Sequence, residues 1–379
     1  MEILYITPSI PNEFSRIRTA NLLKSFKENG CKIDVIALYS NEKELKQLNN
    51  NELFDNITVV KYSKIISYFN CFIGLFLPIP LQNMYVFSIR LHRLLSKIDK
   101  TQYDLIYIKR LRMAGYAKHF DKNKTYIDLT DSLTKYYERV KNFSKGIAKF
   151  INTEEYIKHF KYEIKIAKKY NTIICSDDDK EYLENKHNTK LSNMKVIYNT
   201  IDTAKWYNKN PKNKNKKNKL VFSGVLDYFP NTLAAQFIIN EIMPKLPNNY
   251  SITFVGKNVP SALKKFESKR IHFTGYVDDM KKELQQYDIY LCPIFAGSGS
   301  KNKILQASLV GLPIITTRLG IEGLKKEFEQ FVFIAENSND FVTQIKKLNA
   351  VDISEMVAHQ QKFIIKFYDY KNCTKDLIK

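Results

Sequence analysis

Arginine is scarce in this sequence, since 9 of the 60 basic residues are arginine and 51 are lysine. The formal net charge of +21 at pH 7 would by itself suggest a polyanionic partner. Proteins that read nucleic acids depend more on arginine, whose planar guanidinium pairs with bases and phosphates. We therefore expect no nucleic-acid partner, whereas attraction to an anionic membrane surface stays open.

Cysteine is also rare, and its five positions are scattered. Cys31, Cys71, Cys175, Cys292 and Cys373 form no CxxC pair and no metal-ligand spacing, so no metal site is expected. Cys31, Cys175 and Cys292 fall in or beside predicted strands, as small buried hydrophobic residues do. The N-terminus MEILYITPS lacks the basic start and the apolar run of a secretory signal, so we expect a cytoplasmic protein.

A long uninterrupted apolar run is missing too. The most apolar segment, from Ile65 to Phe87, is broken by Asn70, Pro78 and Pro80. A spanning helix needs roughly 20 consecutive apolar residues. We expect most of this segment to be a buried helix of the first domain. The alternative is an aromatic-rich surface whose tip contacts a bilayer or a lipid-linked substrate, at the inner face of the plasma membrane.

The 379 residues suffice for two α/β domains. Short apolar runs alternate with helical periods, which predicts parallel sheets wrapped by helices. The first seven predicted strands are ILYIT, KIDVIAL, ITVV, DLIYIK, TYIDL, TIICS and KVIYN. Six more follow: LVFSG, SITFVG, IHFTG, DIYLCP, PIITT and FVFIA.

The predicted domain boundaries follow from these patterns. Residues 1–200 form a first Rossmann-like domain, and 220–360 form a second one. A lysine- and asparagine-rich linker, 201–219, joins them. The tail 361–379 has a helical period with an apolar face, so we expect a C-terminal helix that packs back on the first domain.

The most informative motif is a glycine-serine turn after the apolar strand Ile289–Cys292. Glycines let the backbone approach an anion, and the N–H groups and dipole of the next helix favour negative charge. The turn and the following helix supply Gly297, Ser298, Gly299, Ser300, Lys301, Lys303 and Gln306. This pattern indicates a phosphate site, with the Gln306 amide facing a hydroxyl-bearing group. An ordinary strand-helix connection with a solvated helix start is the alternative.

A resemblance covers most of the chain. The second half resembles family-4-type retaining glycosyltransferases of the two-domain GT-B fold, in the bacterial branch that builds exopolysaccharide and surface glycans. The turn and four further segments carry it: FSGVLDYFPN, ITFVGK, FTGYVDD and VIYNTIDT. Weaker matches in the first half are FSRIRTANLLKSFKENG, YDLIYIKR, YIDLTDS and YEIKIAKKYNTIICSDDD.

The resemblance implies that a sugar moves from a nucleoside-diphosphate donor to an acceptor hydroxyl with its anomeric configuration kept. Two doubly wound domains would face each other across a cleft, with the donor against the second and the acceptor against the first. The acceptor would be a glycan or a lipid-linked molecule. No metal or other cofactor is implied, because fixed N–H groups and lysines can stabilise the charge on the leaving phosphates.

The resemblance also assigns residues. Gly297, Gly299 and Ser300 match the diphosphate turn, within which Ser298 is also a binding candidate, and Lys301 and Lys303 match catalytic basic positions. Gly224 would lie near the phosphates, Gln306 near the ribose and Asn199 in the signature between the domains. Arg18 would face the cleft on the acceptor side. Asp131 follows the strand after which some relatives have a histidine, and it is the catalytic candidate there.

Several positions depart from the family pattern. Many members have two glutamates separated by seven intervening residues around the turn, and this chain has Ser298 and Gln306 instead. A neutral amide accepts a hydrogen bond more weakly than a carboxylate. Thr200 and Val225 also stand where other residues are usual. A scaffold subunit that assists a partner transferase is therefore one alternative function, and a sugar-nucleotide epimerase of similar architecture is another.

Two acidic clusters could be mistaken for metal sites. The segment SDDDKEYL, from Ser176 to Leu183, contains a D-x-D, and Asp278 and Asp279 are adjacent. Each lies where a helix is predicted to begin, and carboxylates there are favoured by capping and by the helix dipole. We therefore interpret both clusters as helix starts.

Overall fold

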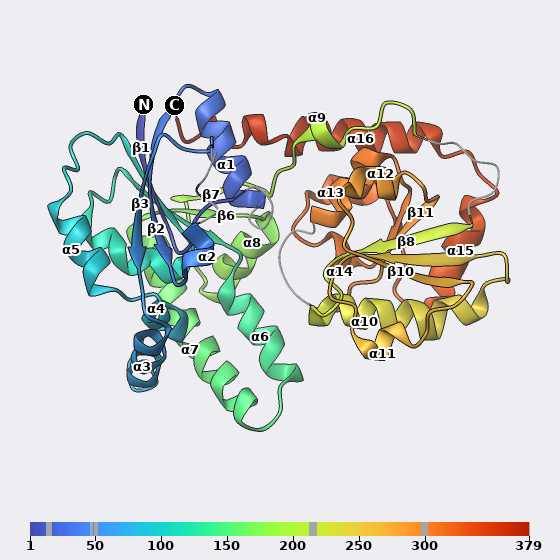
Figure 1. Cartoon of the computed structure of the whole chain (residues 1–379), viewed down its shortest axis with the longest axis horizontal. Coiled ribbons are helices and arrows are strands. Elements are labelled where there is room, and N and C mark those ends of the chain that lie inside the picture. The colour runs from blue at the N-terminus through green and yellow to red at the C-terminus, as the bar shows by residue number, and fades with distance from the viewer. Residues whose placement is uncertain (13–16, 46–47, 49–51, 212–217, 297–301, 379) are drawn as a thin grey trace. The chain divides into compact units, whose positions relative to one another are not determined.

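The structure, a computed structural model, describes residues 1–12, 17–45, 48, 52–211, 218–296 and 302–378 (Figure 1). The chain divides into two compact units. Unit 1 comprises Met1–Asn199 and Tyr370–Lys379, and unit 2 comprises Thr200–Asp369.

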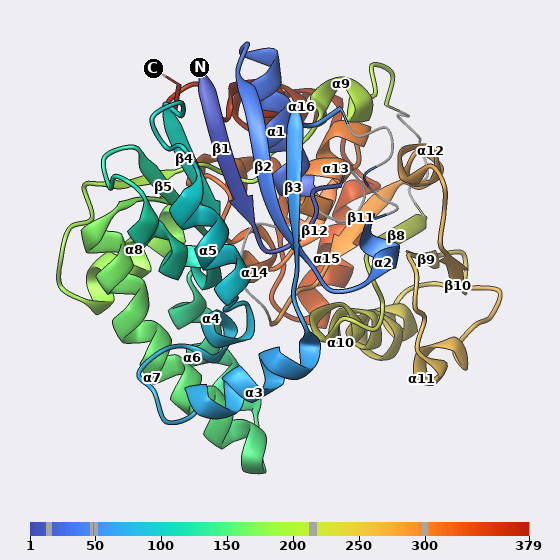
Figure 2. The same ribbon diagram turned by 60° about the vertical axis from the view of Figure 1, so that its left-hand side comes forward.

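Unit 1 is built on a seven-stranded parallel sheet with the order β3-β2-β1-β4-β5-β6-β7. Figure 2 shows β3, β2 and β1 side by side. The strands are β1 (Glu2–Thr7), β2 (Lys32–Tyr39), β3 (Asn56–Lys61), β4 (Leu105–Lys109), β5 (Thr125–Thr130), β6 (Asn171–Ile174) and β7 (Met194–Val196).

Helices cover both faces of this sheet, so its strands are apolar on both sides. Leu4 and Ile6 of β1 pack in one core, and Ile3 and Tyr5 pack in the other. The helices of unit 1 are α1 (Ile17–Glu28), α2 (Glu42–Leu45), α3 (Lys64–Gly74), α4 (Leu81–Tyr85), α5 (Ile89–Lys97), η2 (Leu111–His119), α6 (Leu133–Phe143), α7 (Gly146–Lys169), α8 (Asp177–Lys186) and η6 (Tyr370–Asn372).

Unit 2 contains a six-stranded parallel sheet with the order β10-β9-β8-β11-β12-β13. Every residue of β11 is buried, as expected for a central strand covered on both faces. The strands are β8 (Lys219–Ser223), β9 (Ser251–Val255), β10 (Ile271–Gly275), β11 (Ile289–Cys292), β12 (Ile314–Thr316) and β13 (Phe333–Ile334).

The helices of unit 2 alternate with these strands along the chain. They are α9 (Thr203–Trp206), α10 (Phe229–Phe237), η3 (Ile238–Ile242), η4 (Met243–Lys245), α11 (Ser261–Lys264), α12 (Met280–Leu284), α13 (Asn302–Val310), α14 (Arg318–Ile321), η5 (Lys326–Phe331), α15 (Ser338–Leu348) and α16 (Ser354–Tyr368).

Both sheets confirm the expectation of two doubly wound, Rossmann-like domains, and each predicted strand overlaps an observed one. In both units the strand order reverses next to the first strand, between β1 and β4 and between β8 and β11. Ligands of open parallel sheets bind outside the carboxyl ends of the strands at such a reversal. Each unit therefore has one edge where a site is expected.

Helix starts account for the two acidic clusters. Ser176 caps α8 and accepts a hydrogen bond from the Asp179 N–H, with Asp177 and Asp178 in the same first turn. Asp279 caps α12 through the Lys282 N–H. Capping explains both carboxylate groups without a metal.

The segments at the unit boundary differ in detail from the pattern in the sequence. Asn208, in the polar run, is attached to α13 by N–H donation to the Leu309 carbonyl at 2.9 Å. Helix α16 belongs to unit 2, and the last residues return to unit 1. There the Thr374 and Ser25 hydroxyls lie 2.7 Å apart.

The expectation of a mostly buried helix between Ile65 and Phe87 is wrong for α3. Only Ser67 and Gly74 of this helix are buried, and its large apolar side chains are exposed. Among the described residues, no helix is both long enough and apolar enough to cross a membrane.

Candidate functional site

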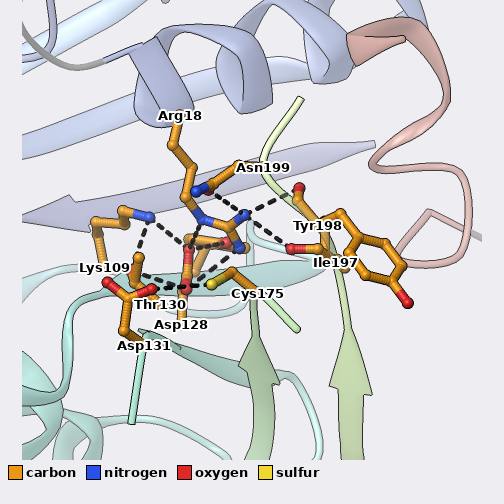
Figure 3. Close-up of polar contacts among 10 residues, drawn as sticks. Arg18, Lys109, Asp128, Thr130, Asp131, Cys175, Ile197, Tyr198 and Asn199 are labelled. Atoms are coloured by element: carbon orange, nitrogen blue, oxygen red, sulfur yellow. Dashed lines mark hydrogen bonds and ion pairs between the residues drawn. The ribbon is translucent and has the colours of Figure 1, made fainter. Parts of the chain in front are cut away.

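In unit 1, the carboxyl edge at the strand reversal is organised around Asp128 of β5 (Figure 3). Its carboxylate is fully buried and accepts a 2.6 Å hydrogen bond from the Lys109 ammonium. The Tyr107 hydroxyl donates to it at 2.7 Å, and the Thr130 hydroxyl at 3.1 Å. A buried carboxylate is stable only when its oxygens are satisfied in this way.

Arg18 of α1 completes the cluster from the other side of Asp128 (Figure 3). Its Nε and Nη2 donate to the two carboxylate oxygens at 3.3 and 3.5 Å. Its Nη1 donates to the carbonyls of Ile197 and Tyr198 at 2.8 and 3.1 Å, and to Asn199 Oδ1 at 3.1 Å. The guanidinium therefore ties α1 to β5 and to the segment after β7.

The charges in this cluster shift one another's titration. Burial alone would raise the pKa of Asp128, but Arg18 and Lys109 outweigh it and hold that pKa well below its usual range. Burial lowers the pKa of Lys109 to about 7, although Asp128 opposes the shift. Because only 4% of the Lys109 side chain is exposed, this lysine serves Asp128 rather than a ligand in solvent.

Two non-glycine residues at this edge have left-handed backbone conformations. Arg110 follows β4 with φ 78°, and Thr130 ends β5 with φ 72°. Such a conformation is unfavourable for a β-branched residue and persists only where the surroundings impose it. The hydroxyl of Thr130, bonded to Lys109 and Asp128, supplies that constraint and positions Asp131 immediately after it.

Asp131 is half-buried and accepts a 2.9 Å hydrogen bond from the Cys175 thiol. Asp179 approaches the same two groups, and one ligand atom of each residue lies within 4.8 Å of the others. Asp179 is paired with the Lys135 ammonium at 2.9 Å, and burial raises the pKa of Cys175 well above its ordinary value. A protonated thiol and a paired carboxylate are poor metal ligands.

In unit 2, the equivalent edge brings Lys303 of α13 next to the end of β8. The Lys303 ammonium donates a 2.7 Å hydrogen bond to Asn231 Oδ1 and lies 4.4 Å from the centre of the Phe222 ring. Asn231 is held in turn by donation from Nδ2 to the Val225 carbonyl at 2.9 Å. The Asn231 amide and the Phe222 ring are neutral groups that orient the ammonium.

Gly224 packs closely against this lysine and against Asn231. A Cβ built there would lie 2.7 Å from Asn231 Nδ2 and 3.0 Å from Lys303 Nζ, and the glycine has φ 153°. Gly256, after β9, lies against it, because a Cβ there would be 1.9 Å from the Gly224 carbonyl oxygen. Only glycine fits at either position, so the backbone approaches the ammonium closely.

The structure brings some of the predicted site residues together. Lys303 and Gly224 are neighbours at one edge of unit 2, and Gln306 is half-buried on the helix that carries Lys303. In unit 1, Arg18 contacts Asn199, while Asp131 joins Cys175 nearby. The predicted turn residues Gly297, Ser298, Gly299 and Ser300, with Lys301, lie outside the described residues.

Sequence reasoning missed three residues of these clusters, namely Asp128, Lys109 and Asn231. A signal existed for the first, since an aspartate inside the apolar run TYIDLT is costly to bury without partners. Lys109 gave a weaker signal at the end of LIYIK. Asn231 gave none, because its contact with Lys303 joins residues 72 positions apart.

Comparisons with known proteins agree with this architecture. Residues 217–350 match the family model described as "Glycosyl transferases group 1". No curated protein sequence matches the chain.

Solved structures match over nearly the whole chain. Sucrose-phosphate synthase from Thermosynechococcus elongatus has a TM-score of 0.69 at 11% identity, covering 99% of this chain and 97% of that one. HepE from Anabaena in complex with UDP-glucose has a TM-score of 0.67 at 12% identity, with coverages of 100% and 98%. WaaG, a glycosyltransferase involved in lipopolysaccharide biosynthesis, has a TM-score of 0.66 at 13% identity and covers 100% of both chains.

The fold is that of GT-B glycosyltransferases. Within this fold, residues 217–350 are similar to the group 1 glycosyl transferases. Three more specific assignments stay predictions: membership of family 4, membership of the exopolysaccharide branch, and retention of the anomeric configuration.

Proposed function

We propose that this chain is a retaining glycosyltransferase that moves a sugar from a nucleoside-diphosphate donor to an acceptor hydroxyl. The observation that carries the proposal is the Lys303 ammonium beside Gly224, at the strand reversal of unit 2. Unit 2 is also the part of the chain that matches the glycosyltransferase family model. We propose that the donor binds unit 2 and the acceptor binds unit 1.

The chemistry requires stabilisation of negative charge on the departing nucleoside diphosphate. An oriented ammonium close to a glycine backbone supplies this stabilisation. Lys301 and the glycine-serine turn are proposed to add charge and N–H groups, on the basis of sequence. Because lysine charge can replace a metal ion at the phosphates, we propose a metal-independent reaction.

We propose the donor base and the pathway from the similarity of the fold to solved structures. The HepE structures contain UDP or UDP-glucose, which favours a uridine diphosphate sugar as the first donor to test, with guanosine diphosphate sugars next. The WaaG structure is of an enzyme involved in lipopolysaccharide biosynthesis, which favours a role in surface polysaccharide or glycolipid assembly. The acceptor would then be a glycan or a lipid-linked molecule.

In unit 1, the charge of Arg18 is used to hold the protein together. The Arg18 guanidinium is engaged by Asp128 and by chain oxygens of residues 197–199. We therefore propose that Arg18 is a positioning residue that fixes the acceptor edge. Asp131, half-buried at the same edge, is the carboxylate proposed to meet the acceptor.

Release of nucleoside diphosphate tests the proposal. The purified chain is incubated with uridine or guanosine diphosphate sugars, with and without a lipid-linked glycan acceptor, and the released nucleotide is measured. Acceptor-dependent release supports the transferase. Donor binding by thermal shift without release would instead identify a scaffold subunit, and acceptor-free interconversion of the sugar nucleotide would identify an epimerase.

A further inference from the structure

Helix α3 presents its bulky side chains to solvent and its small ones to the protein. Ile65 is 82% exposed, Phe69 63% and Phe72 60%, while Ser67 and Gly74 are buried. Phe76, directly after the helix, is 79% exposed. A surface helix of a globular protein normally has the reverse arrangement. A cluster of this kind marks an interaction surface.

The helix is firmly attached, so the exposure reflects a fixed orientation. Gly74 packs against Met84 of α4 so closely that a Cβ would lie 2.7 Å from its Cγ. The buried Lys158 ammonium donates to the carbonyls of Gly74 and Leu75 at 2.8 and 3.3 Å, which satisfies the end of the helix. Figure 1 shows α3 beside α4, at the end of unit 1 away from the chain termini.

A basic pocket adjoins this apolar surface. It has a volume of about 710 Å³ and is lined by α3 and α5 residues that include Lys64, Arg90 and Arg93. No aspartate or glutamate occurs from Asn56 to Ile98. The pocket therefore combines cations with apolar walls. Lys61, one of its lysines, is paired with the Glu42 carboxylate at 2.8 Å.

The pocket opens at the carboxyl edge of the unit 1 sheet. Ser40 follows β2 and Tyr62 follows β3, and both line it. Because all strands of this sheet are parallel, the Arg18 and Asp128 cluster lies at the same edge. A molecule bound at α3 is thus on the side of the sheet where the acceptor is proposed to bind.

We propose that α3 and this pocket form a docking surface for an anionic phospholipid bilayer. Phe69, Phe72 and Phe76 enter the boundary between headgroups and acyl chains, and Arg90 and Arg93 bind a lipid phosphate. The apolar face supplies insertion and the guanidinium groups supply bidentate phosphate contacts. Charge complementarity selects this occupant, since the stretch from Asn56 to Ile98 supplies cations and apolar groups but no carboxylate.

Vesicle co-sedimentation of the full chain tests the proposal. Wild-type protein should bind vesicles of phosphatidylglycerol and phosphatidylcholine in equal parts, and phosphatidylcholine vesicles at least tenfold less. Phe69→Asp/Phe72→Asp and Arg90→Glu/Arg93→Glu should each reduce binding to the anionic vesicles at least tenfold. Equal binding to both vesicle types, or unchanged binding by both variants, would overturn the proposal.

Matched changes in unit 2 are the controls. Tyr276→Asp alters a side chain that is 73% exposed, and Lys264→Glu/Lys265→Glu changes the net charge as much as the arginine variant does. Both should bind like wild type. A loss as large as that of the α3 and α5 variants would mean that net charge or general hydrophobicity governs binding, which contradicts a local surface.

A second copy of this chain is the competing occupant. Light scattering of wild type and Phe69→Asp/Phe72→Asp should give the same molar mass. An oligomer that this variant dissolves would overturn the proposal in favour of a self-association surface. Phe76→Ser, a milder change at an exposed position, replaces the double variant if its thermal unfolding shows a fold defect. Nucleotide release without vesicles is a separate readout, so failure here leaves the transferase proposal standing.

Discussion

The ammonium of Lys303 donates a hydrogen bond of 2.7 Å to the amide oxygen of Asn231. This contact joins α13 to α10 at the carboxyl end of β8. It fixes a cation where the strand order reverses, and there an anionic ligand of a parallel sheet is expected.

Removing this cation should slow the reaction. Lys303→Ala should lower nucleotide release at saturating donor by at least about tenfold, because the charge that grows on the leaving phosphates loses a stabilising partner. Steady-state kinetics measure the effect. Lys264→Ala, at an exposed lysine of the same unit, should match wild type. Equal rates for Lys303→Ala and wild type would remove Lys303 from the mechanism.

A side-chain carbon forced against the lysine should also impair donor binding. Gly224→Ala introduces a Cβ 2.7 Å from Asn231 Nδ2 and 3.0 Å from Lys303 Nζ, at a φ unfavourable for alanine. We expect weaker donor binding by thermal shift and a stability loss of roughly 1–3 kcal/mol. Gly115→Ala is the control, since its Cβ would meet nothing within 4 Å. Undiminished donor affinity in Gly224→Ala would argue against a phosphate at this place.

The Asp128 cluster should be a large contributor to stability. Asp128→Asn leaves the buried Lys109 and Arg18 without their carboxylate, and loss of one partner of a buried pair costs about 3–5 kcal/mol. Chemical denaturation measures this change. Adding Lys109→Met removes one of the stranded cations, so the double variant should be more stable than the sum of the single effects indicates. Additive losses would show that the two residues are not coupled.

The buried carboxyl group of Glu163 should make the stability of the protein depend on pH. Its carboxylate is fully buried and accepts hydrogen bonds from Ser132, Leu133 and Thr134 at the start of α6. Burial nevertheless raises its pKa from 4.5 to about 7. Between pH 4.5 and about 7, the folded state therefore binds more protons than the unfolded state. The contribution of Glu163 to stability is complete below pH 4.5 and is lost as the pH rises to about 7.

The Glu163→Gln variant isolates this effect. Its free energy of unfolding, measured by urea denaturation, should be lower than wild type at acid pH because the amide nitrogen meets N–H donors. It should lack the decline of up to roughly 3 kcal/mol that the titrating carboxyl contributes across this window. The same slope in both proteins would assign the pH dependence to other groups.

Metal removal should not matter to the reaction. Because lysines are proposed to stabilise the leaving phosphates, treatment with a chelator should leave nucleotide release unchanged. Release is measured with and without chelator, and again after Mg²⁺ is added back. Activity abolished by the chelator and restored by Mg²⁺ would overturn the metal-independent assignment.

Local sequence was sufficient for the strands of both sheets. Apolar runs such as LVFSG and DIYLCP could only be strands, because they are too short for helices and end at glycine or proline. The alternation of such runs with helical periods also predicted parallel sheets. Helix α3 was different, because a helix of apolar residues looks the same in sequence whether its bulky side faces a core or solvent.

The sequence by itself determined the two doubly wound domains and the helix starts at Ser176 and Asp279, since these depend on short-range patterns and on topology. Only the tertiary structure decided that Asp128 pairs with Arg18 and Lys109, that Asn231 orients Lys303, and that the bulky side chains of α3 are exposed to solvent. Those contacts join residues far apart in the chain. Their geometry follows from how helices pack on a sheet, which no local pattern specifies.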